Sequence, residues 1–448
     1  MKTIVSPTAA PDDAERLAAV DVGAVEQDWP VLLGLLPPDW EARARSTGAF
    51  QRRRGVPDAS AFLRLIFAYS YCRLSLRLTV FWAEIRGVAA LSEVALRKRL
   101  CRAKPWIGEL LAAKLARHAP LPGQHPPGLR IRLVDATCVR RPGSTGTDYR
   151  LHVGFDLERL TVDQVELTTA AGGETLKRLP ARPGEITIAD RGYSQRQGIA
   201  ALSAQGGAVL VRVNSGALPL EHPDGQCFEL LAALRGLEDT AVGDWAVQTA
   251  PAADGTPAVS GRLVALRKSP QATEAARRKL QAEARRKGRT PDARSLELAG
   301  YVVLFTTVSP ATLSGVEILN LYRFRWQIEL AFKRMKTHLS LAQLPAKDPD
   351  LCQTFLLTQL LAAVLVDELT HRWVDFSPEA TDPERPPSLW RVYQAVSESL
   401  RQLVGAILTP AEWLQVRGRT RGLRDTPRRR LNQGAEARRL PLFHAPVG

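Results

Sequence analysis

The fold is decided by residues 322–336, which read YRFRWQIELAFKRMK. This stretch contains no glycine or proline, and its apolar residues recur at helical spacing, which predicts one uninterrupted helix. At roughly 100° per residue, Tyr322, Arg325, Glu329 and Lys336 share one narrow edge of that helix. A hydroxyl, two cations and one carboxylate on the same edge indicate a site for a polyanion. The alternative interpretation is the solvated face of an ordinary amphipathic helix, where charged residues three or four positions apart are common.

The composition of the chain narrows the class of protein. The chain has 448 residues, of which 45% are hydrophobic. That length and apolar content allow a large buried core and roughly two to four domains. Lysine and arginine number 61 against 46 acidic residues, which gives a formal net charge of +15. A chain with this excess of positive charge most often binds nucleic acid, and a membrane surface is the weaker alternative.

The cysteines and the apolar runs of the sequence indicate where in the cell the protein is located. The five cysteines are scattered and form no CxxC pair, which predicts neither a disulfide framework nor a zinc site and favours the reducing cytoplasm. The start of the chain is too poor in apolar residues to predict a signal peptide. The longest apolar run, residues 355–366, is interrupted by Thr358 and Gln359 and is shorter than the about 20 residues that a bilayer requires. The sequence therefore predicts a cytoplasmic protein without a membrane segment.

The first 125 residues have a helical pattern that ends in a proline- and glycine-rich linker over 120–128. They predict a separate α-helical domain. Within it, the basic segment QRRRG at 51–55 precedes an amphipathic run over 59–85, and Ser92 opens a basic helix over 93–102. Helix, turn and basic helix favour DNA binding. The candidate DNA contacts are Arg97, Lys98, Arg99 and Arg102. An ordinary helical bundle remains the alternative, because helix-turn-helix geometry cannot be read from spacing alone.

Short apolar strands follow this linker. Residues 129–134 alternate in a way that predicts a core strand with Asp135 at its C-terminal end. Two further strands, expected over 149–157 and 161–169, form an antiparallel hairpin. The buried strand over 184–189 ends on Asp190 in the same way as the first. Either aspartate alone could equally be a helix N-cap or a turn former.

A long insertion follows a fifth strand over 208–213. It is expected to contain two strands and a basic polar stretch, over 245–249, 262–266 and 269–289. Such a stretch is typical of a solvated helix, and beside a polyanion site it equally favours contact with DNA. The core sheet resumes over 301–308, and Ser314 with Glu317 resembles a capping box for the helix that follows.

Three carboxylates are candidates for one metal site. Paired divalent ions in phosphodiester chemistry need two or three carboxylate ligands that converge from different elements. Asp135, Asp190 and Glu329 lie at suitable points of three different predicted elements. The three together are a far more specific signal than any one of them.

The order of these residues resembles a known family. Asp135, then the segment DRGY from Asp190, then Y-x2-R-x3-E-x6-K from Tyr322 to Lys336 is similar to the DDE transposases of the bacterial insertion-sequence-four family, with their YREK signature. The resemblance spans about residues 130–340, and the QRRRG segment with its following helix also resembles the N-terminal region of that family. Glu174, in the sequence GGET, resembles another recurring position.

This resemblance implies an α/β fold, with a ribonuclease-H-like mixed-sheet core that a β-rich insertion interrupts and that N- and C-terminal α-helical regions flank. It implies cleavage of double-stranded DNA at inverted-repeat ends, cut-and-paste transfer into target DNA, and a synaptic homodimer. It also implies that Asp135, Asp190 and Glu329 are catalytic and bind two magnesium ions, for which manganese can substitute. Tyr322, Arg325 and Lys336 would hold DNA phosphates.

The expected domain order follows from these elements. It is an α-helical DNA-binding domain at 1–125, the first part of the catalytic core at 126–213, the insertion at 214–299, the second part of the core at 300–345 and a helical C-terminal region at 346–448. That last region contains two amphipathic helices, over 350–373 and 388–408, around a proline-rich break over 377–387. Dimerisation through one of them and plain core packing are equally consistent with the pattern. The arginine-rich tail over 417–430 is either a DNA-binding arm or a solubilising segment.

Two other functions remain open. A catalytically silent DNA-binding protein would be expected to have lost a carboxylate, and none of the three is missing. A metal-dependent nuclease without strand transfer would share every residue named above.

Overall fold

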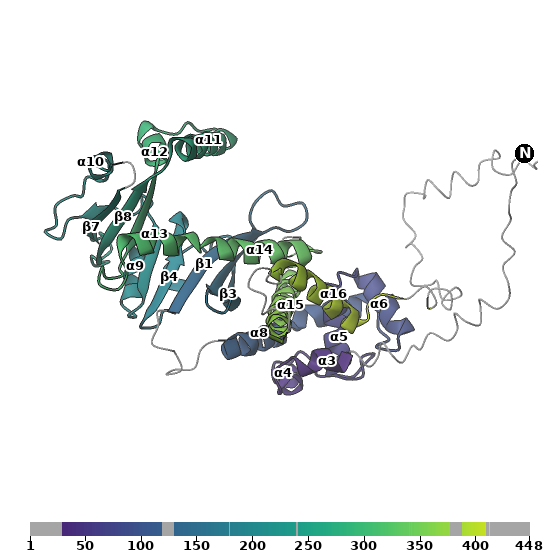
Figure 1. The fold of residues 1–448 in the computed structure, drawn as a ribbon. Coiled ribbons are helices and arrows are strands. Elements are labelled where there is room, and N and C mark those ends of the chain that lie inside the picture. Colours follow the sequence, from purple (N-terminus) through teal and green to yellow (C-terminus); the bar gives the residue numbers. More distant parts are fainter. Residues whose placement is uncertain are drawn as a thin grey trace, which may run out of the picture. The chain divides into compact units, whose positions relative to one another are not determined.

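The computed structural model describes most of the chain (Figure 1). The described residues are 29–118, 130–178, 180–238, 241–339, 341, 343–376, 388–408 and 412. The linker, the proline-rich break and the arginine-rich tail expected from the sequence lie outside them. The chain forms two compact units, one of residues 1–108, 349–358 and 398–448 and the other of residues 109–348 and 359–397.

The second unit is built on a mixed sheet of nine strands, counted over the described residues, in the order β3-β2-β1-β4-β5-β9-β8-β7-β6. The strands are β1 (Arg130–Val139), β2 (Tyr149–Asp156), β3 (Thr161–Thr169), β4 (Glu185–Ala189), β5 (Ala208–Arg212), β6 (Leu220–Glu221), β7 (Val242–Thr249), β8 (Ser260–Arg267) and β9 (Tyr301–Thr306). The strands of the insertion thus continue the same sheet beyond β9.

The antiparallel hairpin expected from the sequence is present as β2 and β3. β1, β2 and β3 form an antiparallel meander, and β4 and β5 follow parallel to β1. β9 then pairs antiparallel with β5. The order 3-2-1-4-5, in which only β2 runs against its neighbours, is the ribonuclease-H-like arrangement. The predicted α/β fold class is confirmed.

One strand boundary differs from its prediction in a way that affects the site. We expected the first strand to end at Asp135, but β1 continues to Val139. The reason is tertiary pairing, because β2 matches β1 residue by residue from Asp156 back to Tyr149 and holds its second half extended. Parallel pairing between β1 and β4 stops at Val134 and Ala189. Asp135 therefore lies inside β1, at the point where β4 ends.

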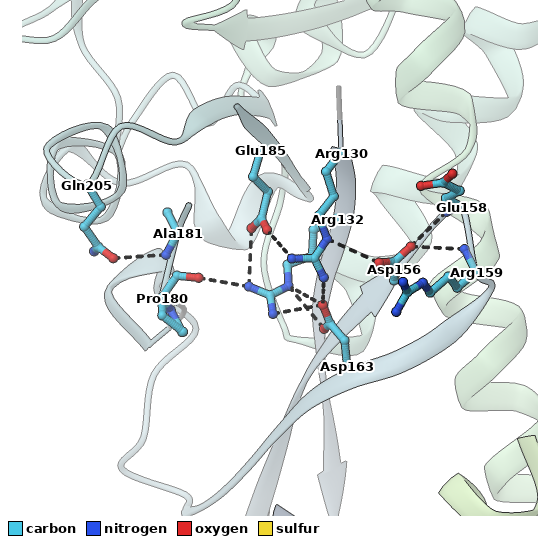
Figure 2. A network of polar contacts seen from close by, with 10 residues as sticks. All are labelled: Arg130, Arg132, Asp156, Glu158, Arg159, Asp163, Pro180, Ala181, Glu185 and Gln205. Carbon is cyan, nitrogen blue, oxygen red and sulfur yellow. Dashed lines mark hydrogen bonds and ion pairs between the residues drawn. The ribbon is translucent and has the colours of Figure 1, made fainter. Parts of the chain in front are cut away.

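A buried ion-pair network fixes the register of the first four strands (Figure 2). Arg130 and Arg132, from β1, bond to Asp163 of β3, with contacts of 2.6 Å from Nη2 of Arg130 and 2.9 Å from Nε of Arg132. Both arginines also reach Glu185 at the start of β4, and Arg130 reaches Asp156 at the end of β2. Buried charges are costly unless they are paired, so a slipped register would leave several of them without partners.

The two faces of β1 have different roles. Side chains alternate along a strand, so Val134 lies on the same face as Arg130 and Arg132, where it joins a hydrophobic core cluster of this unit. Asp135 lies on the opposite face. There the helix α14 lies against β1.

The helices of this second unit lie on and around the sheet. They are α9 (Arg196–Ser203), α10 (Leu230–Arg235), α11 (Pro270–Arg286), α12 (Ala293–Leu298), α13 (Gly315–Arg323) and α14 (Trp326–His338), with 3-10 turns η1 (Leu176–Arg178) and η2 (Arg191–Tyr193). The helix α16 (Leu389–Val404) has residues in both units. The helix α8 (Lys104–His118) begins in the first unit, and α15 (Pro349–Phe376) has residues in both. The capping box expected at Ser314 and Glu317 is present at the start of α13.

The first unit is helical in its described residues. It contains α3 (Trp29–Gly34), α4 (Trp40–Ser46), α5 (Ala59–Ser70), α6 (Leu76–Ile85) and α7 (Glu93–Arg102). The amphipathic run expected over 59–85 is two helices, because Ser75 accepts from Leu78 N–H and caps a new one. The basic helix expected over 93–102 is α7, with Ser92 as its N-cap.

One helix has the length and composition of a membrane span. Within residues 349–373 of α15, a stretch of 18 residues has a mean hydropathy of 1.5, and 78% of that stretch is buried in the structure. The helix also buries Gln359 and Asp367. A mostly buried helix with polar side chains inside its apolar run is typical of a protein core.

Candidate active site

Asp135 and Asp190 lie side by side at the centre of the sheet. Val134 of β1 pairs in parallel with Ala189, the last residue of β4, so the next residue on each strand is an aspartate. β4 ends there because Asp190 caps the turn η2, where its Oδ1 accepts from Gly192 N–H at 2.8 Å. This arrangement brings together two carboxylates that are 55 positions apart in the chain.

The helix expected over 322–336 is interrupted. α13 ends at Arg323 and α14 begins at Trp326. Phe324 and Arg325, between them, keep right-handed helical dihedrals, with φ of −68° and −50°. The bond from Gln327 N–H to Phe324 O spans only three residues. The prediction of one uninterrupted helix is wrong at this junction, although the chain continues along nearly the same path (Figure 1).

Arg325, at this junction, connects the helix to the sheet. Its guanidinium donates to the Glu329 carboxylate, and its Nη1 lies 4.0 Å from Oδ2 of Asp135. Arg325 and Asp135 are each about one-fifth exposed, while Glu329 is 36% exposed. The arginine thereby joins a carboxylate of the helix to one of the sheet.

The local charge is negative enough to perturb ionisation. Burial raises the pKa of Asp135 to about 6, and repulsion from Asp190 and Glu174 acts in the same direction. The Ala136 N–H and the charge of Arg325 oppose that shift. Burial, followed by the charge of Asp190, also raises the pKa of Glu174. A site whose carboxylates repel one another favours a cation.

Glu174 is a fourth carboxylate at this site, and no role for it could be predicted from the sequence. A Cβ built on Gly192 would lie 2.3 Å from Oε2 of Glu174 and 3.1 Å from Oδ1 of Asp190. The two carboxylates therefore flank one glycine. Oε1 of Glu174 lies 4.0 Å from Nε of Arg150, and Gln195 Nε2 donates to the carbonyl oxygens of Glu174 and Gly192 at 3.0 Å.

Of the two remaining residues predicted for the site, Tyr322 lies within it and Lys336 lies further along α14. Burial raises the pKa of Tyr322 to about 12, and the charges of Arg325, Arg212, Asp190 and Arg191 all act on its hydroxyl. Lys336 is exposed, and its Nζ lies 5.9 Å from the centre of the Phe332 ring. Seven residues separate it from Glu329, which is about 10 Å along a helix. The structure therefore gathers Asp135, Asp190, Tyr322, Arg325 and Glu329, with Lys336 further along α14.

The donor set fits a divalent ion by its chemistry. Carboxylate oxygens are the preferred ligands of magnesium and manganese, and Asp135 and Asp190 are neighbours. Within the part of the chain that the structure describes, no three acidic, histidine or cysteine side chains are already grouped as a metal site. Glu329 is bonded to Arg325 instead. A complete three-carboxylate site would require Glu329 to leave that guanidinium.

The basic helix α7 uses one of its cations for structure. Arg99 donates to the carbonyl oxygens of Arg52 and Arg54 at 3.1 and 2.6 Å and thereby holds the QRRRG segment. Arg97, Lys98 and Arg102 are exposed on the same helix.

Comparison with known proteins identifies clear relatives. The family model described as "Transposase DDE domain" matches residues 126–365. The putative transposase InsL of insertion sequence element IS186A from Escherichia coli K12 is 37% identical over 364 residues, which cover 80% of this chain and 98% of that protein. The transposase of insertion sequence element IS421 from Escherichia coli is 37% identical over 365 residues, with the same coverage. A cryo-EM structure of the piggyBac transposase synaptic complex with hairpin DNA overlays with a TM-score of 0.44 at 9% identity, covering 97% of this chain and 88% of that one.

Proposed function

This chain belongs to the DDE transposase family, and from that membership we propose that it cuts DNA at the inverted-repeat ends of a mobile element and joins them to target DNA. The family resemblance seen in the sequence is confirmed, and the chain is an enzyme of DNA transposition. The cut-and-paste route is our proposal. The observations that carry it are that Asp135 lies beside Asp190 in the sheet and that Arg325 contacts both Asp135 and Glu329.

We assign the metal ligands to the three carboxylates. The family generally uses a divalent metal, and we propose two magnesium ions, for which manganese can substitute, held by Asp135, Asp190 and Glu329. Such ions supply an activated water or hydroxyl and stabilise the leaving oxygen in phosphodiester chemistry. In the chain itself, Asp190 is held by the Gly192 N–H and Asp135 by the Ala136 N–H. These bonds orient both carboxylates before any ion arrives.

We assign phosphate binding to the cations of the site, Arg325 and Lys336. The Arg325 fork suits two phosphate oxygens, whereas Lys336 offers a point charge. We propose that a DNA phosphate draws Arg325 away from Glu329, which frees that carboxylate to act with the two aspartates. Tyr322 remains protonated at neutral pH, since its pKa is raised to about 12. Its hydroxyl can therefore donate to the same strand.

The flanking regions complete the proposal. Residues 1–125 would contact the ends through α7, whose exposed cations are Arg97, Lys98 and Arg102. The catalytic core would comprise 126–213 and 300–345 with the insertion at 214–299, and residues 346–448 would contribute to a homodimer in the synaptic complex. The cytoplasm, where chromosomal DNA is accessible in bacteria, is the proposed location.

The deciding experiment separates binding from chemistry. Asp135→Ala, Asp190→Ala and Glu329→Ala should each abolish magnesium-dependent cleavage of labelled end duplexes and leave gel-shift binding intact, because phosphate and groove contacts elsewhere carry the affinity. Asp224→Ala, an exposed acid in a distant turn, is the matched control. Substantial cleavage by any triad variant would contradict the assignment.

A target-joining assay then separates transposition from simple hydrolysis. The wild-type protein is expected to join pre-cut ends to a target plasmid. Cleavage without joined products would favour a nuclease, and binding without either reaction would favour a silent DNA-binding protein.

A further inference from the structure

A cation-lined cavity lies beside the active site. It has a volume of about 340 Å³ and is bounded by the ends of β5 and β8, the turn η2 and the helices α11 and α12. Arg191, Arg212, Lys268 and Lys279 line it, and the acid among its lining residues is Glu283. The cavity therefore carries a strong excess of positive charge.

Three of these cations come from separate parts of the sheet. Arg191 follows the catalytic aspartate Asp190, Arg212 is the last residue of β5, and Lys268 follows β8. Because β9 lies between β5 and β8, the sheet brings Arg212 and Lys268 to the same edge although 56 positions separate them in the sequence. Their convergence is a property of the fold and not of one basic segment.

Arg212 has one side-chain donor that makes no hydrogen bond to the described residues. Its Nε is buried and has no hydrogen-bond partner among the described residues. Lys268 is anchored through a 2.6 Å bond from its Nζ to the Ala299 carbonyl oxygen, which leaves two of its three donors. Burial, and then the charges of Arg212 and Arg191, lowers the pKa of Lys268 to about 8. Charges that repel one another in a half-buried cavity favour an anion between them.

Charges of the cavity and charges of the catalytic site act on the same side chains. The charges of Arg212 and Arg191 from the cavity and of Arg325 from the helix junction all act on the Tyr322 hydroxyl. Arg191 is also influenced by Asp190 and by Glu283 of the cavity wall. A strand whose phosphate lies at Arg325 would therefore have its neighbouring phosphates close to this cavity.

We propose that Arg191, Arg212 and Lys268 form a second phosphate-binding site, which holds a DNA phosphate beside the catalytic carboxylates and is distinct from the edge formed by Tyr322, Arg325 and Lys336. Phosphate suits the site because it offers several oxygens to an arginine fork and a lysine point charge at once. The inference rests on the proposed function, since it names the DNA strand as the source of the phosphate.

The insertion would then take part directly in DNA binding. Lys268 and the helix α11 both belong to it, and Ala276, Leu280 and Glu283, three or four residues apart on α11, face the cavity. Within its described residues α11 buries none of its side chains. That face of α11 is thus a wall of the cavity, and the cations at the end of the helix are outside its lining.

The test uses the full-length protein and a matched pair of double variants. Arg212→Met with Lys268→Met removes two cations from the cavity. Arg285→Met with Lys287→Met removes the same two residue types from the exposed end of α11 and does not alter the lining. Both proteins lose the same net charge, so a difference between them reports the position of the charge.

Binding to an inverted-repeat end duplex is measured by gel shift over a range of salt concentrations. The cavity variant should bind about tenfold more weakly than the control variant, as expected for lost charged hydrogen bonds. The magnitude of its log–log salt slope should fall by about one, the contribution of one phosphate contact. Equal affinity and slope in the two variants would overturn the proposal.

The phosphate itself is located by neutral methylphosphonates placed one at a time around the cleavage point. One position should weaken wild-type binding and have no further effect in the cavity variant. If every position weakens both proteins equally, the site does not hold a DNA phosphate. If inorganic phosphate raises the melting temperature of the wild type but not of the cavity variant, while DNA binding is the same in both, the source is a small anion and the DNA assignment is wrong. A wild type that neither binds nor cuts the ends would instead contradict the proposed function.

Discussion

The Arg325 guanidinium donates a hydrogen bond to Glu329 one helical turn further on, and it also lies 4.0 Å from Asp135. One guanidinium cannot direct its fork to a DNA phosphate and hold Glu329 in the same way at once. Under the proposed function, the arginine would therefore couple the arrival of the DNA strand to the release of the carboxylate. Such a coupling would give Arg325 a larger effect than the about 0–1 kcal/mol expected of an exposed ion-pair partner.

The first prediction concerns that arginine. Arg325→Ala should lower the single-turnover cleavage rate more than it lowers end affinity. The expected loss of transition-state stabilisation is about 2–4 kcal/mol, because a preorganised donor acts mainly on the charge that develops in the transition state. The rate is measured at saturating protein on pre-formed end complexes, and the affinity by gel shift. Arg323→Ala, an exposed arginine at the end of α13, is the control. Near wild-type cleavage by Arg325→Ala would show that the arginine only offsets the charge of Glu329.

The second prediction follows from the net charge of +15. Cations that neutralise DNA phosphates release counterions, so end affinity should fall steeply with salt, with a log–log slope of magnitude about 5 or more. A salt titration by gel shift or fluorescence anisotropy measures it. A nearly flat slope would point to a protein or small-molecule partner.

The third prediction links metal binding to pH. The pKa of Asp135 is raised to about 6 in the protein without metal, so protons compete with the ion for this carboxylate as the pH falls towards 6. The magnesium concentration that gives half-maximal cleavage should therefore rise between pH 8 and pH 6, while end binding without metal is followed separately. A half-maximal concentration that stays constant over this range would show that Asp135 does not bind the ion.

Local patterns were sufficient to place most of the site. Apolar alternation located both strands that bring Asp135 and Asp190 together, and α7 has the bounds that its cap and basic residues indicated. The break at Phe324 and Arg325 could not be predicted, because neither residue disfavours a helix and Arg325 there makes contacts with the sheet. The continuation of β1 beyond Asp135 depends on pairing with β2.

The cavity and the approach of Glu174 to Asp190 depend on how strands and turns pack, and they could not be predicted from the sequence either. Arg212 and Lys268 share a cavity only because β9 inserts between their strands. Glu174 approaches Asp190 only because the segment before η1 lies against the Gly192 turn. Spacing along a chain contains no signal for contacts of this kind.

The last prediction tests how closely that turn must be packed. A Cβ at position 192 would lie 2.3 Å from the Glu174 carboxylate and 3.1 Å from that of Asp190, so Gly192→Ala must move one carboxylate or the turn that orients Asp190. A displacement of about 1 Å in such a site can cost about 100-fold in rate, and a loss of that order is expected in single-turnover cleavage with end binding unchanged. Gly173→Ala is the control, because a Cβ there would have no atom within 4 Å. If the two alanine variants cleave at the same rate, the close approach of Glu174 to the Gly192 turn does not position Asp190.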